Sequence, residues 1–179
     1  MVEEQAVFIK RVGKPSVAFV VLLALAGCGY HLKGTGLMAP PGVSTVFISV
    51  LENRTSESGI ETVFARDLAY EFTRSHVLKV VNKDRADTIL SGSITSLDID
   101  TISHTSTYEA GERRVTITLD LTLKRVGGEV IWSDKALLDR EAYKVSSGKL
   151  TTEENRRTAI EALSKRVAER VHNRILQDF

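Results

Sequence analysis

A strict alternation of apolar and polar residues runs through the middle of the chain. The apolar positions are Val115, Ile117, Leu119, Leu121 and Leu123, and the polar positions between them are Thr116, Thr118, Asp120, Thr122 and Lys124. A period of two predicts a strand with one buried face and one polar face. Gly127-Gly128 follows and predicts a tight turn into a further strand that begins at Val130 and continues to Tyr143.

Three earlier segments are also rich in β-branched and other apolar residues. They cover residues 43–51, 78–81 and 88–102, and each predicts a strand. In the third, Leu90 and Ile94 share one parity, whereas Leu97 and Ile99 share the other. This change of parity predicts a β-bulge near Thr95-Ser96. The polar residues 52–55, after the first strand, predict a turn.

Two amphipathic segments with a helical period separate and follow these strands. The first opens at Ser58-Gly59-Ile60-Glu61, a capping-box pattern, and ends near Arg74; its apolar positions are Ile60, Phe64, Leu68 and Phe72, with Val63 beside them. The second opens at a capping box from Thr151 to Glu154; its apolar positions are Ile160, Leu163, Val167, Val171 and Ile175. Each segment predicts a helix with one buried face.

The order of these elements predicts an α+β fold. Two helices on one face of a small mixed or antiparallel sheet of about four strands would bury both apolar stripes. We expect residues 43–179 to form this single domain. The threonine-rich face of the sheet would then point toward water or toward a partner.

The only cysteine of the chain, Cys28, ends its most apolar run. Lys10, Arg11 and Lys14 precede the uncharged segment 15–27, which is too short to be a good membrane span and is typical of a secretory signal. Leu25-Ala26-Gly27-Cys28 is similar to a lipobox, the bacterial lipoprotein signal. The alternative is a buried structural cysteine on a hydrophobic helix.

Lipidation at Cys28 would divide the chain into three parts. Residues 1–27 would be a cleaved signal peptide, residues 28–42 a lipidated start and linker, and residues 43–179 the domain. Two or more acyl chains hold a protein at a membrane without a spanning helix. Gly29 stands where lipoproteins retained in the inner membrane tend to have an aspartate, which suggests the outer membrane.

Charge and chemistry narrow the function further. The formal net charge of the chain is +1 at pH 7, whereas a general nucleic-acid binder is usually strongly basic. The four histidines are scattered, no serine lies in a G-x-S-x-G elbow, and no cofactor motif is present. Asp98 and Asp100 could bind a cation, although a solvated strand end explains them better. The sequence therefore predicts a protein that is not an enzyme and has no cofactor or metal.

Two motifs resemble the LptE family of lipopolysaccharide-assembly lipoproteins. Residues 28–34, CGYHLKG, resemble the start of its mature members, and Ala86-Asp87 followed by Leu90-Ser91-Gly92 resembles their "AD…LSG" entry to a central hairpin. The element order is also similar to that family's two helices on a four-stranded sheet.

The resemblance implies a role in lipopolysaccharide transport. Members of the family lie as a plug inside the outer-membrane barrel LptD, help that barrel to assemble, and bind lipopolysaccharide. An alternative is a lipid-anchored periplasmic scaffold or activator of cell-wall synthesis enzymes, and a hydrolase is a third, weaker alternative. Co-purification of a large β-barrel or of a cell-wall synthase would separate the first two.

Lipopolysaccharide carries phosphates, which arginine and lysine bind. Arg113-Arg114, expected to open the alternating strand after a turn at Ala110-Gly111, and Lys149, expected in the loop before the last helix, are the candidate ligand-binding residues. The alternative is that all three are solvated surface charges. The other basic residues of the last helix alternate with glutamates, as Glu161 and Lys165 do, which predicts a solvent-facing surface with ion pairs inside the helix.

Overall fold

The structure is a computed structural model that describes residues 38–106 and 109–179. The predicted signal peptide, Cys28 and most of the predicted linker lie outside the described residues. The elements are β1 (Thr45–Ile48), β2 (Glu52–Asn53), α2 (Ile60–Ser75), β3 (Lys79–Val80), the 3₁₀ turn η1 (Lys83–Arg85), β4 (Thr88–Ser106), β5 (Glu109–Arg125), β6 (Val130–Lys144) and α3 (Lys149–Gln177).

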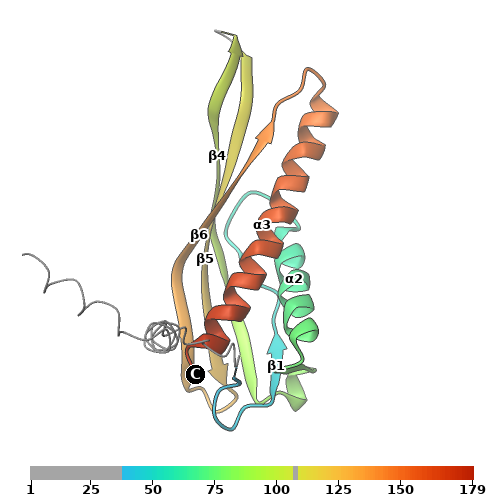
Figure 1. Cartoon of the computed structure of the whole chain (residues 1–179). Helices are drawn as coiled ribbons and strands as arrows, with labels where there is room; N and C mark the ends of the chain where they lie inside the picture. The colour runs from blue at the N-terminus through green and yellow to red at the C-terminus, as the bar shows by residue number, and fades with distance from the viewer. Residues whose placement is uncertain (1–37, 107–108) are drawn as a thin grey trace, which may run out of the picture. The chain divides into compact units, whose positions relative to one another are not determined.

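The described strands form one mixed sheet. Its order is β3-β1-β4-β5-β6, and β2 pairs with β4 further along the same edge as β1. The pairs β1–β3, β1–β4 and β2–β4 are parallel, whereas β4, β5 and β6 form an antiparallel meander. The long β4–β5 hairpin rises beyond the other strands (Figure 1). The end of the sheet at the β4–β5 turn is called the distal end here.

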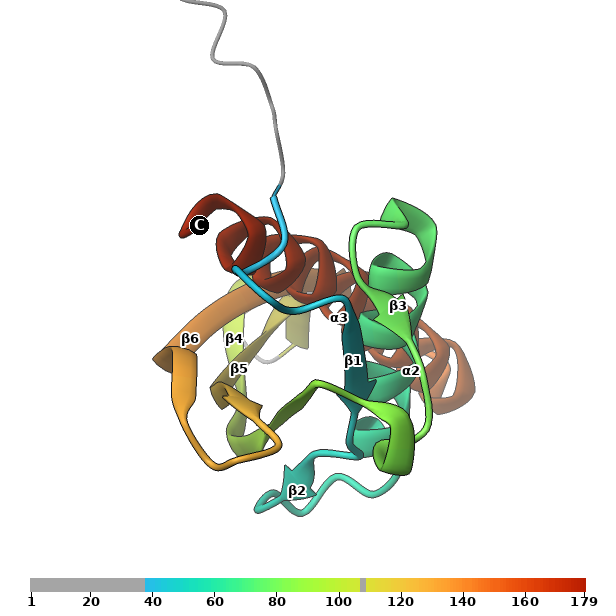
Figure 2. The ribbon, with the colours of Figure 1, turned by 90° about the horizontal axis from the view of Figure 1, so that it is seen from below.

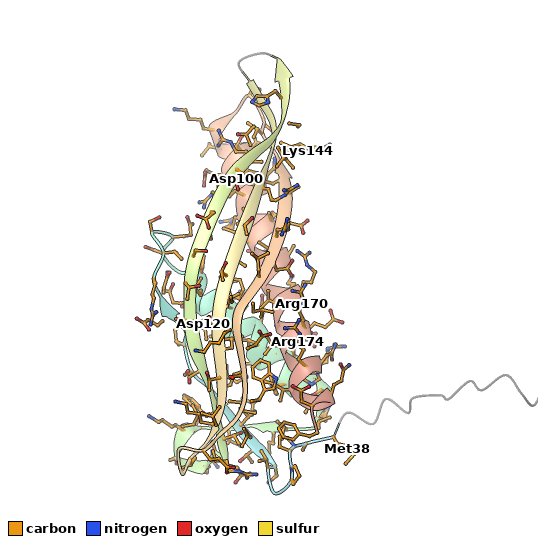
Figure 3. All side chains as sticks on the ribbon, turned by 90° about the vertical axis from the view of Figure 1, so that its left-hand side faces the viewer. Met38, Asp100, Asp120, Lys144, Arg170 and Arg174 are labelled. Atoms are coloured by element: carbon orange, nitrogen blue, oxygen red, sulfur yellow. The ribbon has the colours of Figure 1, made fainter. Side chains whose placement is uncertain are left out.

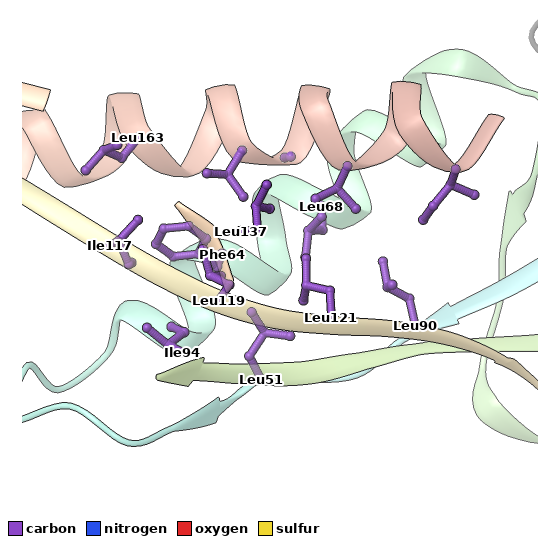
Figure 4. Packing of buried hydrophobic residues seen from close by; sticks show 14 of the residues in the cluster. Leu51, Phe64, Leu68, Leu90, Ile94, Ile117, Leu119, Leu121, Leu137 and Leu163 are labelled. Carbon is purple, nitrogen blue, oxygen red and sulfur yellow. The ribbon is translucent and has the colours of Figure 1, made fainter. Parts of the chain in front are cut away.

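Both helices lie on the same face of the sheet and run in the same direction (Figures 1 and 2). Their apolar stripes meet the apolar face of β5, whose five alternating residues from Val115 to Leu123 are fully buried. Phe64 and Leu68 of α2 and Leu163 of α3 are also fully buried, and Figure 4 shows them packed above the strands. The predicted α+β class, with two helices covering one face, is confirmed.

The sheet has more strands than the four or so that were predicted. Six are described, because two short segments also pair. Residues Glu52 and Asn53, predicted as part of a turn, pair with Ser93 and Ile94 of β4. The predicted bulge is confirmed, since the β4–β5 register shifts between Ile94 and Ser96.

Neither capping box forms as predicted. Helix α2 is capped by Gly59, which lies in the left-handed region at φ 89°, and Ser58 lies outside the helix. Of the two hydrogen bonds expected in a capping box, only one from the glutamate forms: Glu61 Oε2 accepts the Gly59 N–H at 3.0 Å. Helix α3 begins at Lys149, two residues before Thr151, so the predicted cap is already inside the first turn.

The start of the described chain is held against the opposite end of the domain from the β4–β5 turn. The Met38 N–H donates to the Leu176 carbonyl at 3.4 Å, and Arg125 Nη2 donates to the Pro41 carbonyl at 2.8 Å. The last residues of the predicted linker are therefore hydrogen-bonded to the domain. Met38 therefore lies at the end of the sheet that is far from Asp100 and Lys144 (Figure 3).

Candidate functional site

The face of the sheet that points away from the helices is polar and is not covered by any other described element (Figures 1 and 3). Its hydroxyl-bearing residues are Ser91, Ser93, Ser96, Thr116, Thr118, Thr122 and Ser133, placed on this face by the strand register. Some bond locally, as Ser96 Oγ does to Thr118 Oγ1 at 3.2 Å. We call this surface the open face.

Charged residues are unevenly distributed over the distal half of the open face. On β4, Asp98 and Asp100 stand opposite Thr116 and Arg114 of β5. On β6, Arg140 stands opposite Thr116, and Lys144 lies two positions beyond the partner of Arg114. Glu112 of β5 lies on the same face, directly opposite Lys144. The basic side chains are therefore on β5 and β6, and acidic side chains lie beside them on β4 and β5.

Arg114, Arg140 and Lys144 form the cationic group of this face. Alternate residues of a strand share a face, so Arg140 and Lys144 lie diagonally on either side of Arg114, at a spacing of about 7–8 Å. Arg140 and Lys144 are exposed and Arg114 is half-buried. None of the ion pairs among the described residues uses these three side chains. Two guanidinium groups and an ammonium group presented together suit a phosphate-bearing ligand.

The sequence-predicted ligand residues do not meet at one site. Arg113 and Arg114 are strand neighbours, so their side chains point to opposite faces of the sheet. Arg114 is on the open face, whereas Arg113 shares the helix-covered face with Tyr143. Both lie inside β5, which begins at Glu109, so the turn predicted at Ala110-Gly111 is wrong. Lys149 is exposed at the first position of α3 rather than in a loop.

Sequence reasoning missed Arg140 and Lys144. The signal that could have found them is the alternation along β6: Leu137, Asp139 and Tyr143 are buried and Glu141 is half-buried, whereas Leu138, Arg140 and Ala142 are exposed. Asp139 and Glu141 interrupt the alternation of apolar and polar residues, because they occupy positions on the helix-covered face where apolar residues are expected.

Those two acidic residues are explained by a row of arginines on α3. Arg166 bonds Asp139 and Glu141 at 3.1 and 2.8 Å, and Arg170 bonds Asp139 at 2.9 Å. Arg174, one turn further along α3, bonds Asp134. The sequence prediction of ion pairs inside this helix is confirmed at Arg156, which bonds Glu153, but is wrong for Arg166 and Arg170, which bond β6 instead.

The pKa of Asp139 reflects this environment. Burial alone would raise the pKa, but hydrogen bonds from Arg166 and from the Arg140 N–H, together with the charges of Arg166 and Arg170, lower it overall. The carboxylate is therefore held in its charged form between the sheet and α3. Arginines that are committed to this contact are poor candidates for ligand binding.

Neither a metal site nor a membrane-spanning helix is found in the described part of the chain. Within residues 38–106 and 109–179, no group of three or more possible metal ligands is found around Asp98, Asp100 or elsewhere. Over the same residues, no helix is long and apolar enough to cross a membrane.

The sequence profile of one family, described as "LptE: Lipopolysaccharide-assembly", matches residues 43–175, which is most of the chain. The chain belongs to the LptE family. The resemblance to this family is thereby confirmed, and the matched segment coincides with the folded domain. It includes the second motif, whereas residues 28–34 lie outside it. No curated protein matches this LptE-family chain.

Solved structures share the fold of this LptE-family domain at low sequence identity. Lipoprotein B from Nitrosomonas europaea matches with a TM-score of 0.56 and 14% identity, over 83% of this chain and 90% of that one. A minor lipoprotein from Acinetobacter baumannii matches with a TM-score of 0.54 and 14% identity, over 76% and 93% of the two chains. At such identities the likeness shows the fold alone.

The second LptE-like motif has a structural role. Asp87 Oδ2 accepts hydrogen bonds from the Ser44 and Thr45 N–H groups, both at 2.9 Å, which ties the start of β4 to the start of β1. Gly92 lies where β4 and β5 approach closely, because a Cβ there would be 2.1 Å from the Asp120 carbonyl oxygen. The motif therefore fixes the register of the central strands and contributes nothing to the cationic group.

Proposed function

We propose that this LptE-family protein is a non-catalytic, lipid-anchored component of lipopolysaccharide assembly at the outer membrane. In this proposal Cys28 carries the acyl chains on the periplasmic side, and the domain lies as a plug in an LptD-like β-barrel and binds lipopolysaccharide. The single observation that carries the proposal is the open face, a polar sheet surface with a cationic group at its distal half.

A hydrophilic open face suits a plug. The interior of a large outer-membrane barrel is polar and wet, so a sheet face rich in hydroxyl groups can lie against it without burying unpaired polar groups. The direction of the chain also suits this placement. Met38 lies at one end of the sheet, and the charged groups around Asp100 and Lys144 lie toward the other (Figure 3). A tether upstream of Met38 would leave the distal half free to reach into a lumen.

The cationic group suits the phosphates of lipopolysaccharide. Arg114, Arg140 and Lys144 come from two adjacent strands, so the sheet holds them at a fixed spacing. Charge-assisted hydrogen bonds to phosphate contribute about 1.5–3 kcal/mol each. We still propose that Arg113 and Lys149 bind lipopolysaccharide, but at separate contacts on the helix-covered side, where their ligand would be a second phosphate or an acidic sugar.

A charge-reversal experiment tests the binding site. The full chain with Arg114, Arg140 and Lys144 all changed to Glu should bind purified lipopolysaccharide at least about tenfold more weakly than the wild type. A matched control changes Lys79, Lys83 and Arg85 to Glu, which alters the net charge equally at the end of the sheet away from the β4–β5 turn. Equal loss of binding in both variants would show that only the net charge matters. Unchanged binding by the Arg114, Arg140 and Lys144 variant would overturn the assignment of these residues as the ligand site.

Two further measurements complete the test. Changing Arg113 and Lys149 to Glu separately asks whether the helix-covered side contributes. Co-purification from cells then tests the plug: a large β-barrel partner supports it, whereas capture of a cell-wall synthase alone would favour the scaffold alternative. Barrel capture should survive the Arg114, Arg140 and Lys144 variant if the plug and ligand functions are separate.

A further inference from the structure

The two edges of the antiparallel meander differ in how far their outward backbone groups are already hydrogen-bonded. On β6, α3 donates side-chain hydrogen bonds to the outer carbonyls: Arg170 Nη1 bonds the Leu138 oxygen at 3.1 Å and Arg166 Nη2 bonds the Arg140 oxygen at 2.9 Å. Asn155 Nδ2 similarly bonds the Lys144 oxygen at 3.0 Å. These contacts occupy three of the outward carbonyl groups through which a further strand would pair, and α3 lies along this edge, so pairing here is hindered.

The opposite edge, on β4, is only partly covered. Strand β1 pairs with β4 up to Leu90, and β2 pairs up to Ile94. From Ser96 onward, β4 pairs with β5 on one side and with no other described strand on the other. The register is regular from Ser96 to Thr101, and further shifts follow after Thr101. We call residues 96–101 the free edge; it has the length of an average strand.

The pairing pattern shows which backbone groups face outward along the free edge. The Leu90 and Ile94 carbonyls point away from β5, because they accept bonds from Ser49 and Arg54 at 3.0 Å. Antiparallel pairing alternates, and the bulge at Thr95 shifts the alternation by one residue. The outward N–H and C=O groups are therefore those of Leu97, Ile99 and Thr101.

The side chains beside these groups differ between the two faces. Asp98 and Asp100 lie on the open face, are exposed, and take part in no ion pair found among the described residues. On the other face, Leu97 packs against the core, and Ile99 is 40% exposed although its strand partner Val115 is fully buried. A strand placed here would meet acidic groups on one face and an incompletely covered apolar edge on the other.

The geometry points to the free edge as a docking site at which a partner protein adds a β-strand with basic residues on one face and apolar residues on the other. The outward groups of Leu97, Ile99 and Thr101 would form the backbone ladder. Asp98 and Asp100 would pair with the basic residues, and Ile99 would pack beside the apolar ones. This is strand addition to a sheet edge, in which the backbone gives affinity and alternate side chains give selectivity.

A second copy of this chain is the wrong occupant. Two antiparallel copies centred on Ile99 would set Asp98 of one copy against Asp100 of the other, and parallel copies would bring identical aspartates together. Like charges directly opposite each other destabilise a strand pair. The same two aspartates that prevent self-association therefore select a basic partner strand.

The test uses the full chain in detergent and a capped peptide of alternating lysine and valine, about six residues long. We expect saturable binding and slower hydrogen exchange in residues 96–101, and weaker binding by a glutamate–valine peptide. Ile99→Pro removes one outward N–H and should weaken lysine–valine binding by about tenfold. Ile99→Ala keeps that N–H, so it is the matched control and should lose less.

Charge is tested separately with Asp98→Asn and Asp100→Asn together, which should remove the preference for lysine over glutamate peptides. Thermal unfolding of each variant establishes that the sheet is intact, since an edge proline whose N–H faces outward is tolerated. Unchanged binding by Ile99→Pro, equal binding of the two peptides to the wild type, or protection only outside residues 96–101 would each overturn the proposal. None of these results depends on lipopolysaccharide binding.

Discussion

The carboxylate of Asp87 accepts the backbone N–H of Ser44, 43 residues earlier in the chain, at 2.9 Å. The same oxygen also accepts from the Ser44 hydroxyl at 3.0 Å and the Thr45 N–H at 2.9 Å. Three donors converge on one oxygen atom, so the charged form of the carboxylate is strongly favoured. This contact joins the first residues of β1 and β4, the two parallel strands at the centre of the sheet.

The Asp87 contact predicts a specific pH dependence of stability. Hydrogen bonds, first from the Ser44 N–H and then from Thr45 and the Ser44 hydroxyl, lower the pKa of Asp87 from 3.8 to about 2. A carboxyl group with a lowered folded pKa contributes stability that is fully present above the unfolded pKa and is lost as the pH falls through the folded one. We expect Asp87→Asn to be less stable than the wild type near neutral pH.

The difference between these two proteins should shrink as the pH falls from about 4 to about 2. Chemical unfolding of both proteins at several pH values measures it. The comparison isolates Asp87, because Asp139 also has a lowered pKa but is present in both proteins. A difference that stays constant down to pH 2 would contradict the role of the charged carboxylate.

Gly92→Ala should destabilise the fold. The new methyl group would be 2.1 Å from the Asp120 carbonyl oxygen and 2.8 Å from a side-chain carbon of Leu121, so β4 and β5 would have to move apart. Overpacking of this kind costs about 1–3 kcal/mol. Gly127→Ala is the matched control, because nothing lies within 4 Å of a Cβ there. Equal unfolding midpoints for the two variants in urea would show that β4 and β5 can separate without cost.

The facing stripes of the helices should be essential to the core. Leu68 of α2 and Leu163 of α3 are both fully buried, so each change to Ala should cost about 2–5 kcal/mol of the free energy of unfolding. Leu150→Ala is the control, since Leu150 is 82% exposed and its loss should change stability by less than about 0.5 kcal/mol. If Leu68→Ala kept its thermal stability but lost barrel co-purification, α2 would be a partner-binding surface instead of core.

Acylation of Cys28 can be tested in cells. If Cys28 carries the acyl chains, Cys28→Ala should move the protein from the membrane fraction to the soluble periplasm, because two or more acyl chains are enough to hold a protein at a bilayer. Mass spectrometry of the wild type should find a chain that begins at a modified Cys28. An intact leader on an unmodified thiol in the mature protein would end this hypothesis.

The outcome at Arg113 and Arg114 shows why sites are harder to predict than elements. The sequence placed both arginines correctly on the alternating strand, but the loop at Ala110-Gly111 that was to present them is part of β5. Adjacent strand residues point in opposite directions, so only Arg114 reaches the open face. Its partners on that face, Arg140 and Lys144, are at least 26 positions away in the chain, and only the register of β5 against β6 brings them near.

The sequence by itself determined the class of the fold, the two buried helical stripes, the bulge at Thr95-Ser96 and the family. These follow from local periodicity and from short motifs, which act over a few residues. Only the tertiary structure decided which residues meet. Asp139 and Glu141 lie at strand positions where apolar residues are expected, and only the placement of α3, which brings Arg166 and Arg170 against them, explains why they are acidic. The free edge of β4 likewise exists only because β1 and β2 stop short of it. Contacts between distant segments depend on strand register and helix placement, which no single segment encodes.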